Sequence, residues 1–108
     1  ERIAVKWRDI DVAVFKKLPR IPKNCSFIFE AKRFDKGIEA ALEQAVGYLN
    51  TLAIIRPVVL TDGIRYQLYS GNARMQFKPT HYANFAQLKQ PARNFFETLS
   101  RLSHAQRP

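Results

Sequence analysis

The chain has 108 residues and a mass of 12.5 kDa, with 46% hydrophobic and 25% charged residues. This length holds one domain, residues 1–108, with one core, and the composition excludes a disordered chain. The single cysteine excludes an internal disulfide and a cysteine-rich zinc site, and no apolar run reaches the roughly 20 residues that cross a bilayer. We therefore expect a soluble, cytoplasmic protein with no membrane partner. Because no methionine starts the sequence, we also expect a fragment of a longer chain.

The charge balance is strongly basic. Lysine and arginine total 18 against 9 acidic residues, which gives a net charge of +9 and a pI near 10.1. The surplus is concentrated in residues 64–108, which carry seven bases and one acid, Glu97. Such a domain favours a polyanionic partner, nucleic acid before membrane, although a basic surface without a partner is the simpler alternative. Charge alone does not choose between DNA, RNA and a ribosomal or membrane surface.

Three short strands are predicted first, because β-branched and aromatic residues are frequent in three successive segments. They cover residues 2–7, 11–17 and 26–32. Pro19 and Pro22 break the chain between the second and third segments and predict a loop there. A helix from Ile38 to about Leu52 should follow. Its apolar face at helical spacing comprises Ile38, Leu42, Ala45, Val46 and Leu49.

The second half of the chain predicts three more strands and a helix. The apolar run 57–61 is typical of a strand covered on both faces, and Asp62-Gly63 is a two-residue hairpin signal. Alternation predicts strands over 64–69 and 73–78, with a turn at 70–72. The last helix should bury Ala92, Phe95, Phe96, Leu99 and Leu102. The order β-β-β-α-β-β-β-α indicates an α/β domain with a mixed β-sheet flanked by helices.

One group of charged residues is placed where it could do chemistry. Glu30 and Lys32 are two apart at the end of a strand, so both point to the same face. If the second and third strands pair as a hairpin, placing Asp11 opposite Glu30 puts the turn within the loop at 19–22. Two carboxylates at one edge suit Mg²⁺, and a lysine beside them can orient a water or stabilise charge. Asp9 is the competing carboxylate, and a solvated strand end with a surface ion pair is the simpler interpretation.

The helix offers a second polar pair. Gln44 and Tyr48 are four residues apart and therefore lie on one side of the helix. Tyr48 stands at the edge of the apolar face, where it could reach over the sheet toward a site. From the helix alone, a rim core residue beside a solvated glutamine is the favoured interpretation.

Together these residues resemble the PD-(D/E)xK nuclease superfamily, and most closely the N-terminal nuclease domain of type I restriction enzyme R subunits. The resemblance covers about residues 9–70 and is carried by Asp11, Glu30-Ala31-Lys32, Gln44-x-x-x-Tyr48 and Thr61-Asp62-Gly63. It implies a restriction-endonuclease-like fold and an endonuclease domain that uses Mg²⁺, with Mn²⁺ as the alternative cation, to hydrolyse DNA phosphodiester bonds. By this resemblance Asp11, Glu30 and the Ala31 carbonyl hold the metal and Lys32 is the catalytic lysine. Gln44 and Tyr48 would contact DNA or support the site.

Further basic residues complete the expected DNA surface. Arg33 directly follows the catalytic lysine, and Tyr69, Arg74, Lys78, Lys89 and Arg93 could form a phosphate-contacting face beside the site. The expected partners are DNA and other subunits or domains of a restriction complex. The alternatives are a catalytically inactive nucleic-acid-binding module of the same fold and a small basic scaffold domain.

Overall fold

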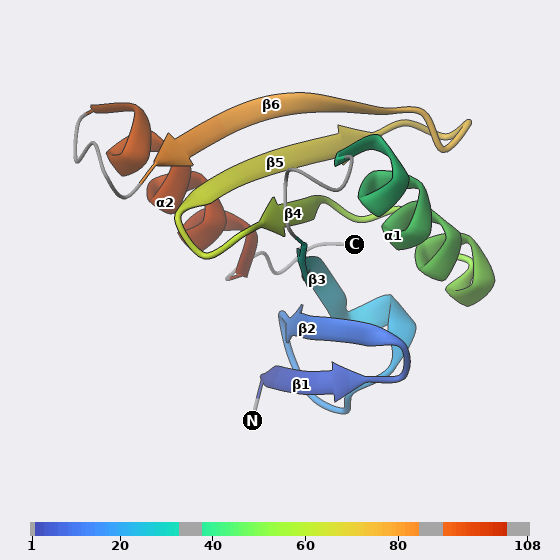
Figure 1. Cartoon of the computed structure of the whole chain (residues 1–108). Helices are drawn as coiled ribbons and strands as arrows, with labels where there is room; N and C mark the ends of the chain where they lie inside the picture. Colours follow the sequence, from blue (N-terminus) through green and yellow to red (C-terminus); the bar gives the residue numbers. More distant parts are fainter. Residues whose placement is uncertain (1, 33–37, 85–89, 104–108) are drawn as a thin grey trace.

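The computed structural model describes residues 2–32, 38–84 and 90–103 (Figure 1). The described elements are β1 (Ile3–Trp7), β2 (Ile10–Phe15), a 3-10 turn (Pro22–Asn24), β3 (Cys25–Ala31), α1 (Ile38–Leu52), β4 (Val58–Thr61), β5 (Arg65–Gly71), β6 (Phe77–Asn84) and α2 (Gln90–Ser103). The predicted order of strands and helices is confirmed.

The strands of the described chain form one six-stranded sheet in the order β1-β2-β3-β4-β5-β6. β3 and β4 are parallel, and every other neighbouring pair is antiparallel. A parallel pair needs a crossover connection, and α1 supplies it. The predicted mixed sheet is therefore confirmed. Figure 1 shows the sheet strongly twisted, with β3 drawn at a steep angle between the β1–β2 hairpin and strands β4, β5 and β6.

The two helices cover opposite faces of the sheet. Side chains alternate along β3, so that Ile28 belongs to the core cluster under α1 and Phe27 to the cluster under α2. The helices contribute the buried residues Ala41, Ala45 and Leu49 on one side and Phe95 and Leu99 on the other. No helix in the described part of the chain is long and apolar enough to cross a membrane.

The helix predictions are largely confirmed. α1 has the predicted bounds, and Ile38 and Leu42 pack against its core cluster as expected. Ala41, which the predicted apolar face omits, is buried as well. In α2 the predicted Leu102 packs against the second cluster, whereas the side chains of Ala92 and Phe96 lie outside the described part of the structure.

The hairpin between β4 and β5 is shifted by one residue from its predicted position. The Asp62 backbone N–H donates to the Arg65 carbonyl (3.3 Å), so the two central residues are Gly63 and Ile64. Gly63 has φ +98°, a left-handed conformation that glycine adopts easily. Asp62 Oδ1 accepts hydrogen bonds from the N–H groups of Ile64 (3.0 Å) and Arg65 (2.8 Å). Ile64 is therefore an exposed turn residue rather than the first residue of a strand.

The predicted strand over 73–78 is wrong for all but its last two residues. β5 continues to Gly71, and residues 72–76 form the turn that leads to β6. Asn72 Oδ1 accepts hydrogen bonds from the backbone N–H groups of Arg74 (2.9 Å) and Gln76 (3.1 Å). Met75 adopts a left-handed φ of +59°. The polar and apolar residues alternate here as in a strand, but the Asn72 side chain provides the hydrogen bonds of a turn.

Candidate active site

The two predicted carboxylates lie side by side on neighbouring strands. Val12 pairs with Phe29, which places Asp11 opposite Glu30 in the same register. The Asp11 backbone N–H donates to Glu30 Oε1 (3.2 Å), and the Ala31 backbone N–H donates to Asp11 Oδ2 (2.9 Å). The predicted pairing of Asp11 with Glu30 is confirmed.

This pair lies where the parallel strands β3 and β4 end. Ala31 pairs with Thr61, and the Lys32 backbone N–H donates to the Thr61 carbonyl (2.8 Å). Glu30 lies on the face of β3 that carries Ile28, which is the face covered by α1. In open α/β sheets, ligands bind beyond the carboxyl ends of the strands. The backbone therefore places Asp11, Glu30 and Lys32 at the usual position of an α/β active site.

Glu30 is a buried carboxyl group with a raised pKa. It is only 2% exposed, between core strands. Burial raises its pKa from 4.5 to about 7, and the negative charge of Asp11 adds to this effect, although the Asp11 backbone N–H opposes it. Burial therefore brings the pKa of this carboxyl group close to neutral pH.

Asp11 has the opposite behaviour. Its partial burial alone would raise its pKa, but the Ala31 backbone N–H and the Lys6 ammonium outweigh burial and hold the pKa below its ordinary value. Lys6 Nζ lies 3.2 Å from Asp11 Oδ1. Environments that separate the pKa values of two neighbouring carboxylates are typical of acid–base sites.

Lys32 is the predicted catalytic lysine, and its charge acts on both carboxylates. The positive charge of Lys32 lowers the pKa of both Glu30 and Asp11, although burial and the backbone hydrogen bonds have larger effects on these pKa values. Its side chain is half-buried at the strand end. The structure therefore brings together all three predicted central residues.

α1 brings Tyr48 to the same cluster. Burial raises the pKa of the Tyr48 hydroxyl, and the negative charges of Glu30, Asp9 and Asp11 raise it further, against a hydrogen bond from Gln44. Tyr48 is half-buried and Gln44 is exposed. The interpretation of Tyr48 as only a rim core residue is therefore incomplete, because its hydroxyl lies within the field of the acidic residues.

A small cavity adjoins this cluster at the turn between β1 and β2. Its volume is about 230 Å³, and its lining residues are Arg8, Asp9, Ile10, Tyr48, Thr51 and Leu52. Asp9 occupies the turn, and the residue opposite Glu30 is Asp11. Asp11 is therefore the better-placed carboxylate of the two.

The donor set fits a hard divalent cation. Asp11 and Glu30 each use one oxygen to accept a backbone hydrogen bond, Asp11 through Oδ2 and Glu30 through Oε1. The oxygens of the two carboxylates, including Asp11 Oδ1 in contact with Lys6, and the Ala31 carbonyl are ligands of the type that Mg²⁺ prefers. Among residues 2–32, 38–84 and 90–103, no group of three or more His, Cys, Asp or Glu side chains could hold a metal ion. A cation here would depend on these two carboxylates and water.

The outer basic residues are placed less favourably than predicted. Arg74 lies in the turn that follows β5, and Lys78 pairs with Ser70, so both lie at the end of the sheet opposite the carboxylates. Tyr69 is buried in the core, which corrects its predicted place on a phosphate-contacting face. Arg33 and Lys89 and the side chain of Arg93 lie outside the described residues.

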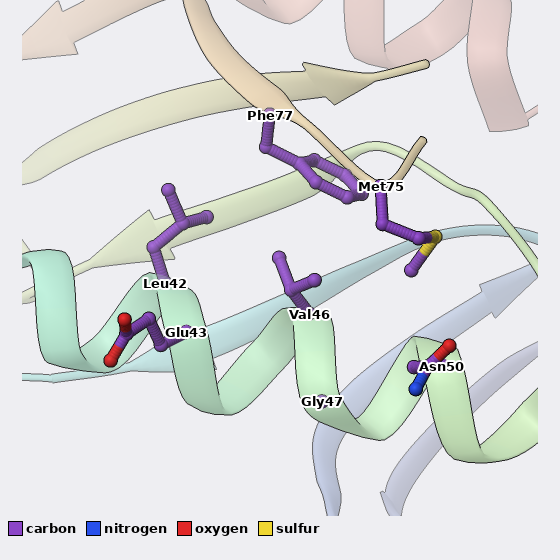
Figure 2. A pocket seen from close by; sticks show the side chains of 7 residues that line it. All are labelled: Leu42, Glu43, Val46, Gly47, Asn50, Met75 and Phe77. Atoms are coloured by element: carbon purple, nitrogen blue, oxygen red, sulfur yellow. The ribbon is translucent and has the colours of Figure 1, made fainter. Parts of the chain in front are cut away.

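A larger cavity, of about 430 Å³, lies between α1 and the β5–β6 connection. Figure 2 shows Met75 and Phe77 facing Leu42 and Val46 across it. Neither of the two carboxylates nor Lys32 lines this cavity. It is therefore separate from the candidate site.

Sequence reasoning missed Lys6 and the Arg8–Asp9 cavity. The tight turn pairs Trp7 with Ile10 and so places Lys6 opposite Asp11. The sequence signal for the contact was the Lys6-x-x-x-x-Asp11 spacing across a two-residue turn, but that signal requires the turn to be located first.

No family model, curated protein or solved structure matches this chain.

Proposed function

We propose that this chain is a Mg²⁺-dependent endonuclease domain of the restriction-endonuclease-like fold that hydrolyses DNA phosphodiester bonds. The observation that carries the proposal is the buried Glu30 carboxyl group, paired with Asp11 and followed by Lys32 at the end of β3. Burying an ionisable group costs stability, and buried ionisable groups with shifted pKa values are concentrated at functional sites. The resemblance to the PD-(D/E)xK superfamily assigns such a site to the same three residues.

The residues divide the chemistry between them. Asp11, Glu30 and the Ala31 carbonyl would hold the metal, which supplies Lewis-acid stabilisation of the phosphate and an acidified water. The Lys32 ammonium would donate a hydrogen bond to the attacking water or to the charge that develops on the phosphate. Tyr48, with Gln44, would orient a DNA phosphate beside the carboxylates. Mn²⁺ has the same ligand preference and should replace Mg²⁺.

DNA is the proposed partner because the net charge is +9. Contacts through lysine and arginine bind phosphates without reading sequence, so binding by this domain should be largely sequence-independent. Other subunits or domains of a restriction complex would provide sequence recognition.

An inactive nucleic-acid-binding module of the same fold is the second candidate. The observation that favours it is the contact between Lys6 and Asp11 Oδ1 (3.2 Å), because an ammonium already neutralises this carboxylate. The two candidates differ in whether the site binds a divalent cation.

Calorimetry with Mn²⁺ separates the two functions. Wild-type protein should bind Mn²⁺, and Glu30→Gln and Asp11→Asn should each weaken binding by at least tenfold, because each removes a charged ligand. Asp9→Asn is the matched control and should bind as wild type does. Nicking of supercoiled plasmid DNA in Mg²⁺ should follow the same ranking. Absence of Mn²⁺ binding by the wild type would favour the inactive module, and a large loss in Asp9→Asn would transfer the ligand role to Asp9.

A further inference from the structure

Lys6 faces the candidate site from the edge strand of the sheet. The pairs Val5–Val12 and Trp7–Ile10 place Lys6 opposite Asp11. The Lys6 ammonium contacts Asp11 Oδ1 at 3.2 Å, and its side chain remains 78% exposed. The ammonium therefore covers the solvent side of this carboxylate.

The backbone at Lys6 is unusual for its position. Lys6 has φ +58°, in the left-handed region that non-glycine residues rarely occupy. Arg8 has the same φ, but Arg8 begins a two-residue hairpin turn, which requires a positive φ. Lys6 lies inside β1, where the turn places no such requirement. Residues in sparsely populated conformations concentrate at functional sites, and this one carries a cation to the carboxylate pair.

The two carboxylate oxygens of Asp11 have partners of different rigidity. Oδ2 accepts a hydrogen bond from the Ala31 backbone N–H, which the pairing of β2 with β3 fixes in place. Oδ1 is held by the long, exposed side chain of Lys6. Exposed ion pairs of this kind contribute little stability and exchange easily. Oδ1 is therefore the Asp11 oxygen that can exchange the Lys6 ammonium for another cation.

We propose that Lys6 binds a DNA backbone phosphate and becomes available for this contact when Asp11 ligates a divalent cation. The inference rests on the proposed function, since it requires a cation at Asp11. The released ammonium stays on the exposed side of the site, next to the carboxylates, where a phosphate must approach. A divalent cation at Asp11 repels the Lys6 ammonium and competes with it for the negative charge of this carboxylate, so metal and DNA bind cooperatively, and the coupling passes through Lys6.

The test is the salt dependence of DNA binding with and without metal. The affinity of the full chain for a fluorescent DNA duplex is measured by anisotropy, once in EDTA and once in Ca²⁺. The salt concentration is varied between roughly 50 and 200 mM, a range in which phosphate contacts make the affinity fall steeply. The variant Lys6→Asn removes the charge, and asparagine tolerates a left-handed φ. Lys17→Asn, an exposed lysine beyond the opposite end of β2, is the matched control.

The expected result is a difference that grows with metal. In Ca²⁺ the salt slope of Lys6→Asn should be smaller than that of wild type by about one unit, the size of one lost phosphate contact. In EDTA the difference between the two slopes should be clearly smaller, because Asp11 then competes with the phosphate for Lys6. Lys17→Asn should differ from wild type equally in both conditions. A Lys6→Asn deficit of the same size in EDTA and Ca²⁺, or no deficit in either, overturns the proposal.

Calorimetry with Mn²⁺ in the absence of DNA distinguishes failure of this inference from failure of the proposed function. Lys6→Asn should bind Mn²⁺ tighter than wild type by roughly threefold to tenfold, because no ammonium has to leave and a nearby positive charge is removed. Lys6→Arg should bind as wild type does. Mn²⁺ binding that is lost in Glu30→Gln but is equal in wild type and Lys6→Asn overturns the role of Lys6 alone. No Mn²⁺ binding by any of these proteins overturns both.

Discussion

Replacing the buried carboxyl group of Glu30 should remove a pH dependence of stability. The pKa of Glu30 rises from 4.5 to about 7 on folding, chiefly because the group is buried. Between these two values the folded state holds a proton that the unfolded state has lost, so stability falls as the pH rises through this window. At 1.36 kcal/mol for each pKa unit, the loss amounts to about 3 kcal/mol and is complete above roughly pH 7. In Glu30→Gln this loss is absent.

Urea unfolding followed by tryptophan fluorescence measures the effect. Trp7 is the only tryptophan and packs edge to face on Phe15, with ring centroids 5.0 Å apart, so its emission should report on the fold. The free energy of unfolding of Glu30→Gln relative to wild type should increase by about 3 kcal/mol between pH 4.5 and pH 8. Glu43→Gln, an exposed glutamate on α1, is the matched control and should retain the wild-type profile.

The effect of Asp11 on stability does not fall in the pH range in which Glu30 acts. Its pKa is lowered from 3.8, so the stability that it contributes is present above this value and is lost as the pH falls below it. The two carboxylates therefore act in separate pH ranges. A stability difference between wild type and Glu30→Gln that stays constant from pH 4.5 to pH 8 would refute the assignment of Glu30 as a buried group with a raised pKa.

Two further predictions concern catalysis and packing. Lys32→Ala should keep the fold and Mn²⁺ binding but lose at least about 100-fold in plasmid cleavage, the usual scale for removing a proton-transfer or charge-stabilising group; cleavage at the wild-type rate would remove Lys32 from the mechanism. Gly71→Ala should cost about 1–3 kcal/mol in urea unfolding, because its Cβ would lie 2.5 Å from the Phe77 ring. Gly47→Ala, whose Cβ meets nothing within 4 Å in a helix, should instead gain about 0.5–1 kcal/mol. Equal stabilities of the two alanine variants would contradict this reasoning.

The predictions that succeeded depended on local patterns with a single period. The helical spacing of apolar residues located α1 from Ile38 to Leu52, because only a helix brings those positions to one face. The prolines at 19 and 22 located the loop between β2 and β3, and the loop fixed the register that brings Asp11 beside Glu30. The candidate site could be predicted for the same reason, since two strands joined by a short loop have few possible registers.

The turns of the second half were less predictable from the sequence. Alternation over residues 73–78 is compatible with a strand, and only the hydrogen bonds of the Asn72 side chain decide for a turn. Tyr69 is a further case, because its burial depends on the packing of α1 and β5 in the folded chain.

The sequence by itself therefore determined the order of the elements and the residues that share a strand end, because both follow from spacing along the chain. Only the tertiary structure decided the properties of those residues. Glu30 is buried because it lies on the face of the sheet that α1 covers, and burial is what raises its pKa to about 7. Lys6 reaches Asp11 because β1 folds back on β2 through a two-residue turn. A charge acquires its pKa and its partner from the groups that surround it in space, and spacing along one strand does not specify those groups.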